Sequence, residues 1–203
     1  MWMGNIMTER TYQDAITDQC TQYAQKYPLA RFIGYNTIKG SRMYKTLSHV
    51  PEDQCIEMPV CENLMMGMAI GLALDGMRPV VCFERHDFLL IGLDALVNHA
   101  DKMGWMSGEQ FNLPIIVRVI VGAQHPLNPG MQHTMDYTKA LRHMLKFTEV
   151  IEPMSERMMD RAWNEIVGRT ISGTVIIVEH RDRYNWTLDD DGMYSQDATK
   201  SGE

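Results

Sequence analysis

Apolar residues along this chain form short runs separated by glycine, proline and charged residues. The shorter runs are rich in valine and isoleucine and show no clean alternation, which is typical of strands covered on both faces. Longer amphipathic or uniformly apolar runs between them are typical of helices. We predict strands over residues 31–35, 55–58, 79–84, 114–121, 148–152 and 174–179. Strands alternating with helices predict a single-domain α/β fold, with a parallel sheet and helices on both of its faces.

The predicted helices carry recognisable start signals. Thr11, with Asp14 three residues later, imitates a capping box for a helix that reaches about residue 27. Ser155 is a good N-cap for a helix over residues 155–170. Further helices are expected over residues 62–74, 90–103 and 134–146.

The segment 62–74 is apolar on every side, which predicts a buried helix. Gly67 and Gly71 lie inside it, and a glycine costs about 1 kcal/mol relative to alanine in a helix interior. Two such glycines favour the close approach of another helix. That helix belongs either to a second subunit or to the same chain.

The chain is expected to form one domain over residues 9–183, followed by a disordered tail over residues 184–203. The tail contains three consecutive aspartates, Asp189, Asp190 and Asp191, and then mostly small polar residues. A segment of this composition has too little apolar surface to offset the entropy cost of folding.

Charge and composition exclude several classes of protein. Nineteen Lys and Arg against 26 Asp and Glu give a net charge of −7 over the 203 residues, so no nucleic-acid partner is expected. No apolar run approaches the roughly 20 residues that span a membrane, and the N-terminus is too quickly charged for a secretory signal. Cys20, Cys55, Cys61 and Cys82 show no metal-binding spacing. We therefore expect buried reduced thiols, no metal site and a cytoplasmic protein.

The motifs of several familiar enzyme classes are absent from the sequence. It has no G-x-x-x-x-G-K-[ST] phosphate loop and no G-x-G-x-x-G after a strand. It also lacks the G-x-S-x-G nucleophile elbow and the H-E-x-x-H zinc motif.

One ordered set of segments is far more specific than any of its parts. Its members are Met58-Pro59-Val60-Cys61-Glu62, the glycine-punctuated helix, Gly76–Val81, Phe88, Met106-Ser107-Gly108, Pro114–Arg118 and Gly130-Met131-Gln132-His133. Over roughly residues 9–182 this set resembles the pyrimidine-binding domain of thiamine diphosphate enzymes. The resemblance is strongest to the β subunit of 2-oxo acid dehydrogenase E1 components.

The resemblance implies roles for four residues around the cofactor. Glu62 matches the carboxyl group that hydrogen-bonds the pyrimidine ring and so helps the cofactor lose its thiazolium C2 proton. Phe88 matches the aromatic side chain that packs on the same ring, while Pro59 and Met65 match residues flanking it. The residues alone leave two alternatives open: Glu62 could merely cap a helix, and Phe88 could be a core residue after a strand.

Histidines are the next candidates. His133 matches the active-site histidine of the family's G-x-Q-H segment, which implies acid/base work or an anion contact to the substrate. Gln124-His125 offers a competing Gln-His pair, so His125 is the alternative for this role. His86 lies two residues before Phe88, where it either tunes the substrate pocket or is simply exposed.

Departures from the family pattern imply that the site is shared between subunits. Gly34-Tyr35-Asn36 stands where E1 β subunits carry an acidic stretch, and a second, C-terminal domain is not seen. The Gly-Asp-Gly…Asn motif that holds Mg²⁺ and the diphosphate is also missing. The resemblance therefore implies that a separate diphosphate-binding, E1 α-like subunit holds Mg²⁺, in an α2β2-like assembly.

The implied activity is cleavage of a C–C bond next to a carbonyl in a 2-oxo acid or ketose donor. Decarboxylation followed by acyl or aldehyde transfer is the reaction of the E1-like relatives. The alternatives are a carboligase or transketolase-like biosynthetic subunit, and a non-catalytic scaffold partner of a true E1.

Overall fold

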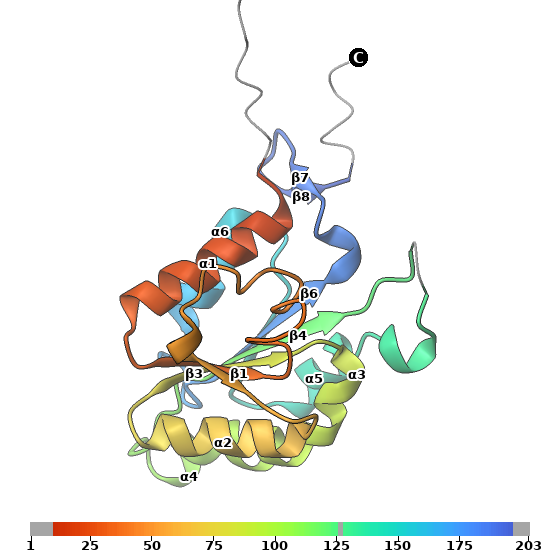
Figure 1. The fold of residues 1–203 in the computed structure, drawn as a ribbon. Coiled ribbons are helices and arrows are strands. Elements are labelled where there is room, and N and C mark those ends of the chain that lie inside the picture. The colour runs from red at the N-terminus through yellow and green to blue at the C-terminus, as the bar shows by residue number, and fades with distance from the viewer. Residues whose placement is uncertain (1–9, 126–127, 197–203) are drawn as a thin grey trace, which may run out of the picture.

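A six-stranded parallel sheet lies at the centre of the computed structural model, which describes residues 10–125 and 128–196 (Figure 1). The strands lie in the order β2-β1-β3-β4-β6-β5, and every neighbouring pair is parallel. They are β1 (Ala30–Gly34), β2 (Cys55–Glu57), β3 (Arg78–Phe83), β4 (Ile116–Val121), β5 (Glu149–Ile151) and β6 (Val175–His180). The predicted α/β fold with a parallel sheet is confirmed.

One face of the sheet is covered by α1 (Tyr12–Lys26) and by α6 (Glu156–Asp160), which continues into a π-helical turn over Arg161–Ile166 (Figure 1). The predicted capping box is present, because Thr11 and Asp14 bond to each other's backbone N–H groups. Ser155 caps α6 as predicted. Tyr23 of α1 and Trp163 meet edge to face, with their ring centroids 5.5 Å apart, in the core of this layer.

The opposite face is covered by α2 (Glu62–Leu74), by a π-helical turn over Ala95–Ala100 and by α5 (Thr138–Met144) (Figure 1). Helix α2 has the predicted bounds, but it is buried on one side only. Gly67 and Gly71 face open space, since a Cβ built on either would meet nothing within 4 Å. Tight packing of these glycines within the chain, one of the two alternatives, is therefore wrong.

A row of short helical pieces over residues 86–106 replaces the predicted helix over residues 90–103. These are α3 (His86–Leu89), a 3₁₀ turn over Leu90–Gly92, the π-helical turn and α4 (Met103–Met106). Gly92 packs closely against α2, where an added Cβ would lie 3.0 Å from Met66 Cγ. Asp101 accepts the backbone N–H groups of residues 146–148 before β5. Both contacts fix the local backbone, so the tertiary structure overrides a regular helix.

Residues 184–196 correct part of the expected disordered tail. They include a short antiparallel pair, β7 (Thr187–Leu188) and β8 (Tyr194–Ser195). Tyr184 and Tyr194 are buried against Tyr12 of α1, with ring centroids 6.2 and 5.0 Å from its own. The rings of Tyr12, Tyr184 and Tyr194 supply the apolar surface on which this segment folds, although its aspartate-rich composition predicts disorder. Residues 197–203 lie outside the described residues.

A buried ion pair ties the sheet to the loops at its carboxyl edge. The Arg118 guanidinium donates to both carboxylate oxygens of Glu179, at 2.7 and 3.0 Å, and to the Thr46 hydroxyl at 3.0 Å. The Tyr184 hydroxyl donates to the same carboxylate at 2.8 Å. The bidentate pair is fully enclosed, and it receives further hydrogen bonds from three segments outside the sheet, the third through Cys20 Sγ, which accepts from Arg118 at 3.3 Å.

The cysteines only partly match expectation. Cys20, Cys55 and Cys82 are free and buried as predicted, but Cys61 is exposed because it is the N-cap of α2. No helix within residues 10–125 and 128–196 is long and apolar enough to cross a membrane. The same residues contain no group of three or more His, Cys, Asp or Glu side chains that could hold a metal ion.

Candidate functional site

The carboxyl edge of the sheet is where a ligand is expected. Strands β1 and β3 are neighbours, but the chain runs from β1 outward to β2 and from β3 outward to β4 on the other side. Ligands of open α/β sheets bind beyond the carboxyl ends of the strands at such a switch point. The residues that follow β1, β2 and β3 therefore frame the candidate site.

Glu62 begins α2 just after β2 and has only 3% of its surface exposed. Its side chain makes no hydrogen bond or ion pair with any residue that the structure describes. Cys61 is the N-cap, and the helix start has no side-chain capping bond. Buried polar groups nearly always have a partner. A carboxyl group so enclosed and without one suits a ligand that supplies the missing donor.

Tyr35 lies directly after β1, and the charge of Glu62 acts on its side chain. The sequence alone did not indicate Tyr35 as a site residue. Burial, and then the negative charges of Glu62 and Glu84, raise the pKa of its phenol. The Tyr35 hydroxyl is buried and has no partner among the described residues. Tyr35 therefore stays protonated at neutral pH.

Glu57, at the end of β2, fixes the turn that follows β1. Its carboxylate accepts the backbone N–H groups of Asn36 and Ile38 at 2.9 and 2.7 Å, and the Thr37 hydroxyl at 3.1 Å. Burial opposes the charged form, but these hydrogen bonds outweigh it and lower the pKa of Glu57. Asn36 in turn donates to the Glu84 carboxylate at 2.9 Å. The register between β1 and β2 places these residues together, and neither strand's own pattern indicates it.

Phe88 and His133 meet in one cavity of about 520 Å³. Their ring centroids are 5.3 Å apart and the rings lie edge to face. Phe88 comes from α3, whereas His133 ends a 3₁₀ turn over Met131–His133. The structure thus brings together two of the predicted site residues that lie 45 positions apart in the chain (133 − 88 = 45).

The position of His133 depends on Gly122, immediately after β4. A Cβ at residue 122 would lie 1.9 Å from the His133 carbonyl oxygen, so only glycine allows the loop to pass this close. His133 Nδ1 is buried without a partner among the described residues. The imidazole thus keeps one nitrogen unused beside the cavity.

His86 is fully buried, so the alternative that it is simply exposed is wrong. Its Nδ1 accepts the backbone N–H of Tyr137 at 3.4 Å and lies 3.6 Å from an Asp136 carboxylate oxygen. Burial lowers the pKa of His86 to about 4, and the Asp136 charge offsets only part of that effect. His86 is therefore neutral at pH 7 and holds the segment that follows His133.

The remaining candidates lie elsewhere. His125 is exposed and lines a second cavity, away from Phe88. Pro59 is exposed in the segment between β2 and α2, and Met65 is fully buried in the core beneath α2.

Glu62 does not line the cavity of Phe88 and His133. It lies beside Gly92, where an added Cβ would be 3.3 Å from the Glu62 carbonyl oxygen.

Comparison with known proteins matches residues 8–187 to the family described as "Transketolase, pyrimidine binding domain". The pyruvate dehydrogenase E1 component subunit β of Gracilaria tenuistipitata var. liui is 30% identical over 132 residues, which are 63% of this chain and 40% of that protein. Its counterpart from Rickettsia conorii is 29% identical over 149 residues, 71% of this chain and 45% of that protein. The chain thus spans less than half the length of these relatives.

Two solved structures share the fold. A split gene transketolase, described as an inactive β4 tetramer, matches with a TM-score of 0.63 and 16% identity, over 91% of this chain and 55% of that one. Transketolase from Leishmania mexicana matches with a TM-score of 0.67 and 16% identity, over 88% of this chain and 26% of that one. At this identity the likeness concerns the fold alone.

Proposed function

Because this chain belongs to the family of transketolase pyrimidine-binding domains, we propose that it forms one half of a composite thiamine diphosphate site. The other half comes from a diphosphate-binding, E1 α-like subunit in an α2β2-like assembly. The reaction is decarboxylation or C–C cleavage of a 2-oxo acid or ketose donor, followed by transfer of the acyl or aldehyde fragment.

The observation that carries this proposal is the unpartnered carboxyl group of Glu62. Thiamine diphosphate supplies a carbon acid, thiazolium C2, whose conjugate base attacks a carbonyl and then accepts the electron pair of the broken bond. Glu62 would hold the pyrimidine end of the cofactor by a hydrogen bond between its carboxyl group and the ring nitrogen. The low exposure of Glu62, 3% of its surface, would strengthen that hydrogen bond.

Phe88 and His133 have complementary roles in the adjoining cavity. The Phe88 ring would provide an apolar face for the pyrimidine, while Pro59 and Met65 lie on either side of Glu62 along the chain, at the start of α2. His133 holds or moves a proton at the substrate oxygen, because its Nδ1 lacks a partner within the described chain. His86, neutral and buried, positions the segment after His133 through Tyr137.

The diphosphate and Mg²⁺ are assigned to the partner. Mg²⁺ prefers carboxylate and carbonyl oxygens together with phosphate oxygens. The sequence lacks the Gly-Asp-Gly…Asn motif, and the described residues contain no cluster of metal-ligating side chains. The residues present therefore suit the pyrimidine end of the cofactor and not its metal-bound end.

The outer face of α2 is proposed as a subunit contact. Val60, Leu64 and Leu74 are exposed apolar side chains on and beside the helix, with Gly67 and Gly71 open between them. Small residues allow the close approach of a second helix. This surface is where another subunit would complete the site near Glu62.

The test is substitution of Glu62 in the assembled enzyme, purified with its diphosphate-binding partner. Glu62→Gln should slow deuterium exchange at cofactor C2, followed by NMR, by orders of magnitude, because an amide cannot share the proton that a carboxyl group shares. Glu165→Gln, on an exposed glutamate of the π-helical turn after α6, is the matched control. An exchange rate in Glu62→Gln equal to that of the control would overturn the assignment.

A further inference from the structure

Asp87 is a polar residue of the cavity that holds Phe88 and His133, and the proposed function does not use it. It comes directly before Phe88, in the first turn of α3. Its Oδ2 is buried and accepts no hydrogen bond from any residue that the structure describes. The sequence did not indicate Asp87, because an aspartate in the first turn of a helix is common whatever the function. A buried carboxylate oxygen without a partner points to a ligand that donates a hydrogen bond.

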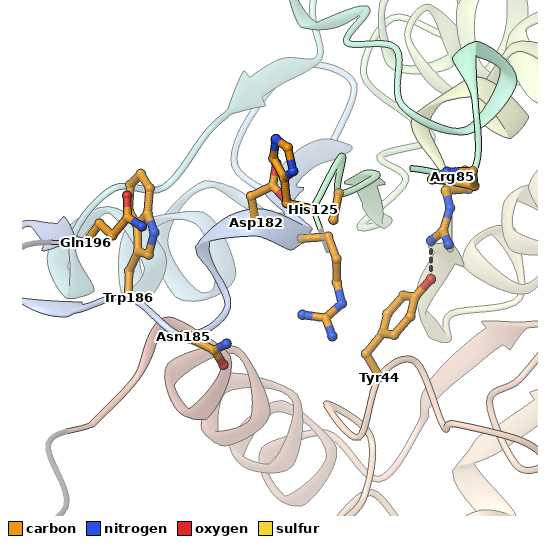
Figure 2. A pocket seen from close by; sticks show the side chains of 10 residues that line it. Tyr44, Arg85, His125, Asp182, Asn185, Trp186 and Gln196 are labelled. Carbon is orange, nitrogen blue, oxygen red and sulfur yellow. Dashed lines mark hydrogen bonds between the residues drawn. The ribbon is translucent and has the colours of Figure 1, made fainter. Parts of the chain in front are cut away.

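No lysine or arginine neutralises Asp87 among the described residues, and the described lining of the cavity contains neither residue type. Arg85, two residues earlier, lines the second cavity instead, where it donates to the Tyr44 hydroxyl (Figure 2). Gly122 lies between the two cavities, since a Cβ there would be 1.9 Å from the His133 carbonyl oxygen and 3.3 Å from Arg85 Cδ. The Asp87 carboxylate is therefore an acceptor whose charge is not compensated from within the described chain.

His133 Nδ1 is the second atom of this kind in the cavity. Among the described lining residues, only Asp87 Oδ2 and His133 Nδ1 are buried polar side-chain atoms without a hydrogen-bond partner. The edge-to-face contact of His133 with Phe88, at 5.3 Å between ring centroids, holds the imidazole beside the residue that follows Asp87. The two side chains form no hydrogen bond or ion pair with each other. Because they line one cavity without meeting, a third atom has room between them.

A hydroxyl group matches this pair of atoms. An ionised carboxylate only accepts hydrogen bonds, and an imidazole nitrogen that carries a proton donates one. A hydroxyl oxygen donates one hydrogen and accepts another, so a single hydroxyl group satisfies both atoms. A second carboxylate would be repelled by Asp87, and a methyl group would leave both buried atoms unpaired.

We infer that Asp87 selects substrates that carry a hydroxyl group on the carbon next to the reacting carbonyl, and that Asp87 and His133 bind this hydroxyl together. The proposed function places His133 at the substrate oxygen, so a hydroxyl bound to His133 lies on a neighbouring carbon. Leu90, Met131 and Met135 make much of the remaining wall apolar, which leaves Asp87 to distinguish one small substrate from another. The inference rests on the proposed function and narrows its donor to a hydroxylated 2-oxo acid or ketose.

The experiment is a competition between hydroxypyruvate and pyruvate, which differ by that hydroxyl group alone. Both are supplied at equal concentration to the enzyme assembled with its diphosphate-binding partner, and NMR follows their consumption. The ratio of the initial rates equals the ratio of the two kcat/KM values, and the unaltered enzyme should favour hydroxypyruvate. Asp87→Leu, which removes the acceptor at similar size, should lower this preference about tenfold to a hundredfold, the effect of losing one charge-assisted hydrogen bond.

Two further variants show whether the change comes from the carboxylate. Asp87→Asn, whose amide oxygen still accepts a hydrogen bond, should keep part of the preference. Asp53→Leu, on an exposed aspartate of the 3₁₀ turn before β2, is the matched control and should keep all of it. A general loss of structure would slow both donors alike and leave the ratio unchanged. The same ratio in Asp87→Leu and Asp53→Leu, or no preference for hydroxypyruvate in the unaltered enzyme, would overturn the inference.

A binding measurement on the whole chain needs neither thiamine diphosphate nor a partner. Hydroxyacetone should shift the imidazole signal of His133 in a ¹³C NMR spectrum more than acetone does, and Asp87→Leu should abolish the difference; His133→Gln assigns the signal. Equal shifts from the two ketones in the unaltered chain would also overturn the inference. Consumption of neither donor by the assembled enzyme would instead contradict the proposed function, so the two failures are distinguishable.

Discussion

At the scale of single residues, the candidate site is held by backbone contacts and burial more than by side-chain hydrogen bonds. Glu62 is enclosed at the start of α2, and His133 is brought to Phe88 because its carbonyl oxygen rests against Gly122. His133 Nδ1 is buried without a partner within the described chain, and the Glu62 side chain, 3% exposed, makes no hydrogen bond there. Such unsatisfied groups at one edge of a sheet are the expected mark of a binding site.

His86 gives a prediction about pH. Its pKa is lowered to about 4 in the folded chain, against about 6.5 when unfolded, so the unfolded state binds the proton more tightly. The stability that comes from neutral His86 is present above pH 6.5 and is lost as the pH falls toward 4, by roughly 3 kcal/mol in all. His86→Phe should remove this contribution to the slope of unfolding free energy against pH, measured by urea denaturation.

The control for that experiment is His143→Phe, on an exposed histidine of α5. Its slope between pH 4 and 6.5 should match that of the unaltered chain. A slope for His86→Phe as steep as the control's would show that His86 does not titrate on unfolding.

At the scale of elements, α2 has one buried face and one face that packs against no other part of the described chain. Met65, Met66 and Ala69 pack against the sheet, while the exposed side carries glycines among apolar side chains. A glycine inside a helix lowers its stability, so two of them on an open face have no benefit to the isolated chain. Their benefit would lie in the contact with another subunit.

Gly67→Ala and Gly71→Ala should therefore act in opposite directions on folding and on assembly. Each should stabilise the isolated chain by about 1 kcal/mol in urea denaturation, since the new methyl group enters open space. Each should also weaken association with the partner subunit, measured by sedimentation. Gly92→Ala is the contrasting variant, because its Cβ would press on Met66, and it should destabilise the chain. Destabilisation by Gly67→Ala would contradict the open face.

The strands and α2 could be predicted because each is a continuous apolar run with turn residues at its ends. The helix over residues 90–103 could not, since Gly92 and Asp101 take their conformation from contacts with α2 and with residues 146–148. The order of residues 184–196 depends on Tyr12, at the other end of the chain. Segments stabilised by distant residues carry no local signal of their structure.

The candidate site, like the fold, could be predicted from the sequence only in part. Phe88 and His133 could be predicted to meet because the order and spacing of their motifs resemble a known family. The environment of Tyr35 and the anchoring role of Glu57 could not be predicted, because both depend on how β1 and β2 align. The convergence of Arg85 and Arg181 on Tyr44 likewise joins three separate segments.

At the scale of the whole molecule, the chain offers one edge with two adjoining cavities and one open helix face. It spans 40% and 45% of the two E1 β relatives compared above, and the sites proposed here use only part of a cofactor. The open face of α2 and the cavity of Phe88 and His133 are the features on which the proposed assembly rests.

The pure chain should accordingly bind thiamine diphosphate with Mg²⁺ weakly or not at all in calorimetry, because ligands for the metal are not present in the described residues. Co-expression with a diphosphate-binding subunit should yield a complex with two composite sites and tight, Mg²⁺-dependent binding. Tight, Mg²⁺-dependent binding by the pure chain would rule out the shared site.

The buried Arg118–Glu179 pair has a consequence for how ligands are received. Because the Arg118 guanidinium also donates to the Thr46 hydroxyl, the loop that carries Tyr44 cannot open without breaking a buried, charge-assisted hydrogen bond. The rim of the second cavity is thereby made part of the same cooperative unit as the sheet. Tyr44 is thus placed as the chain folds, and a group that is ordered in advance loses less entropy when it takes part in binding.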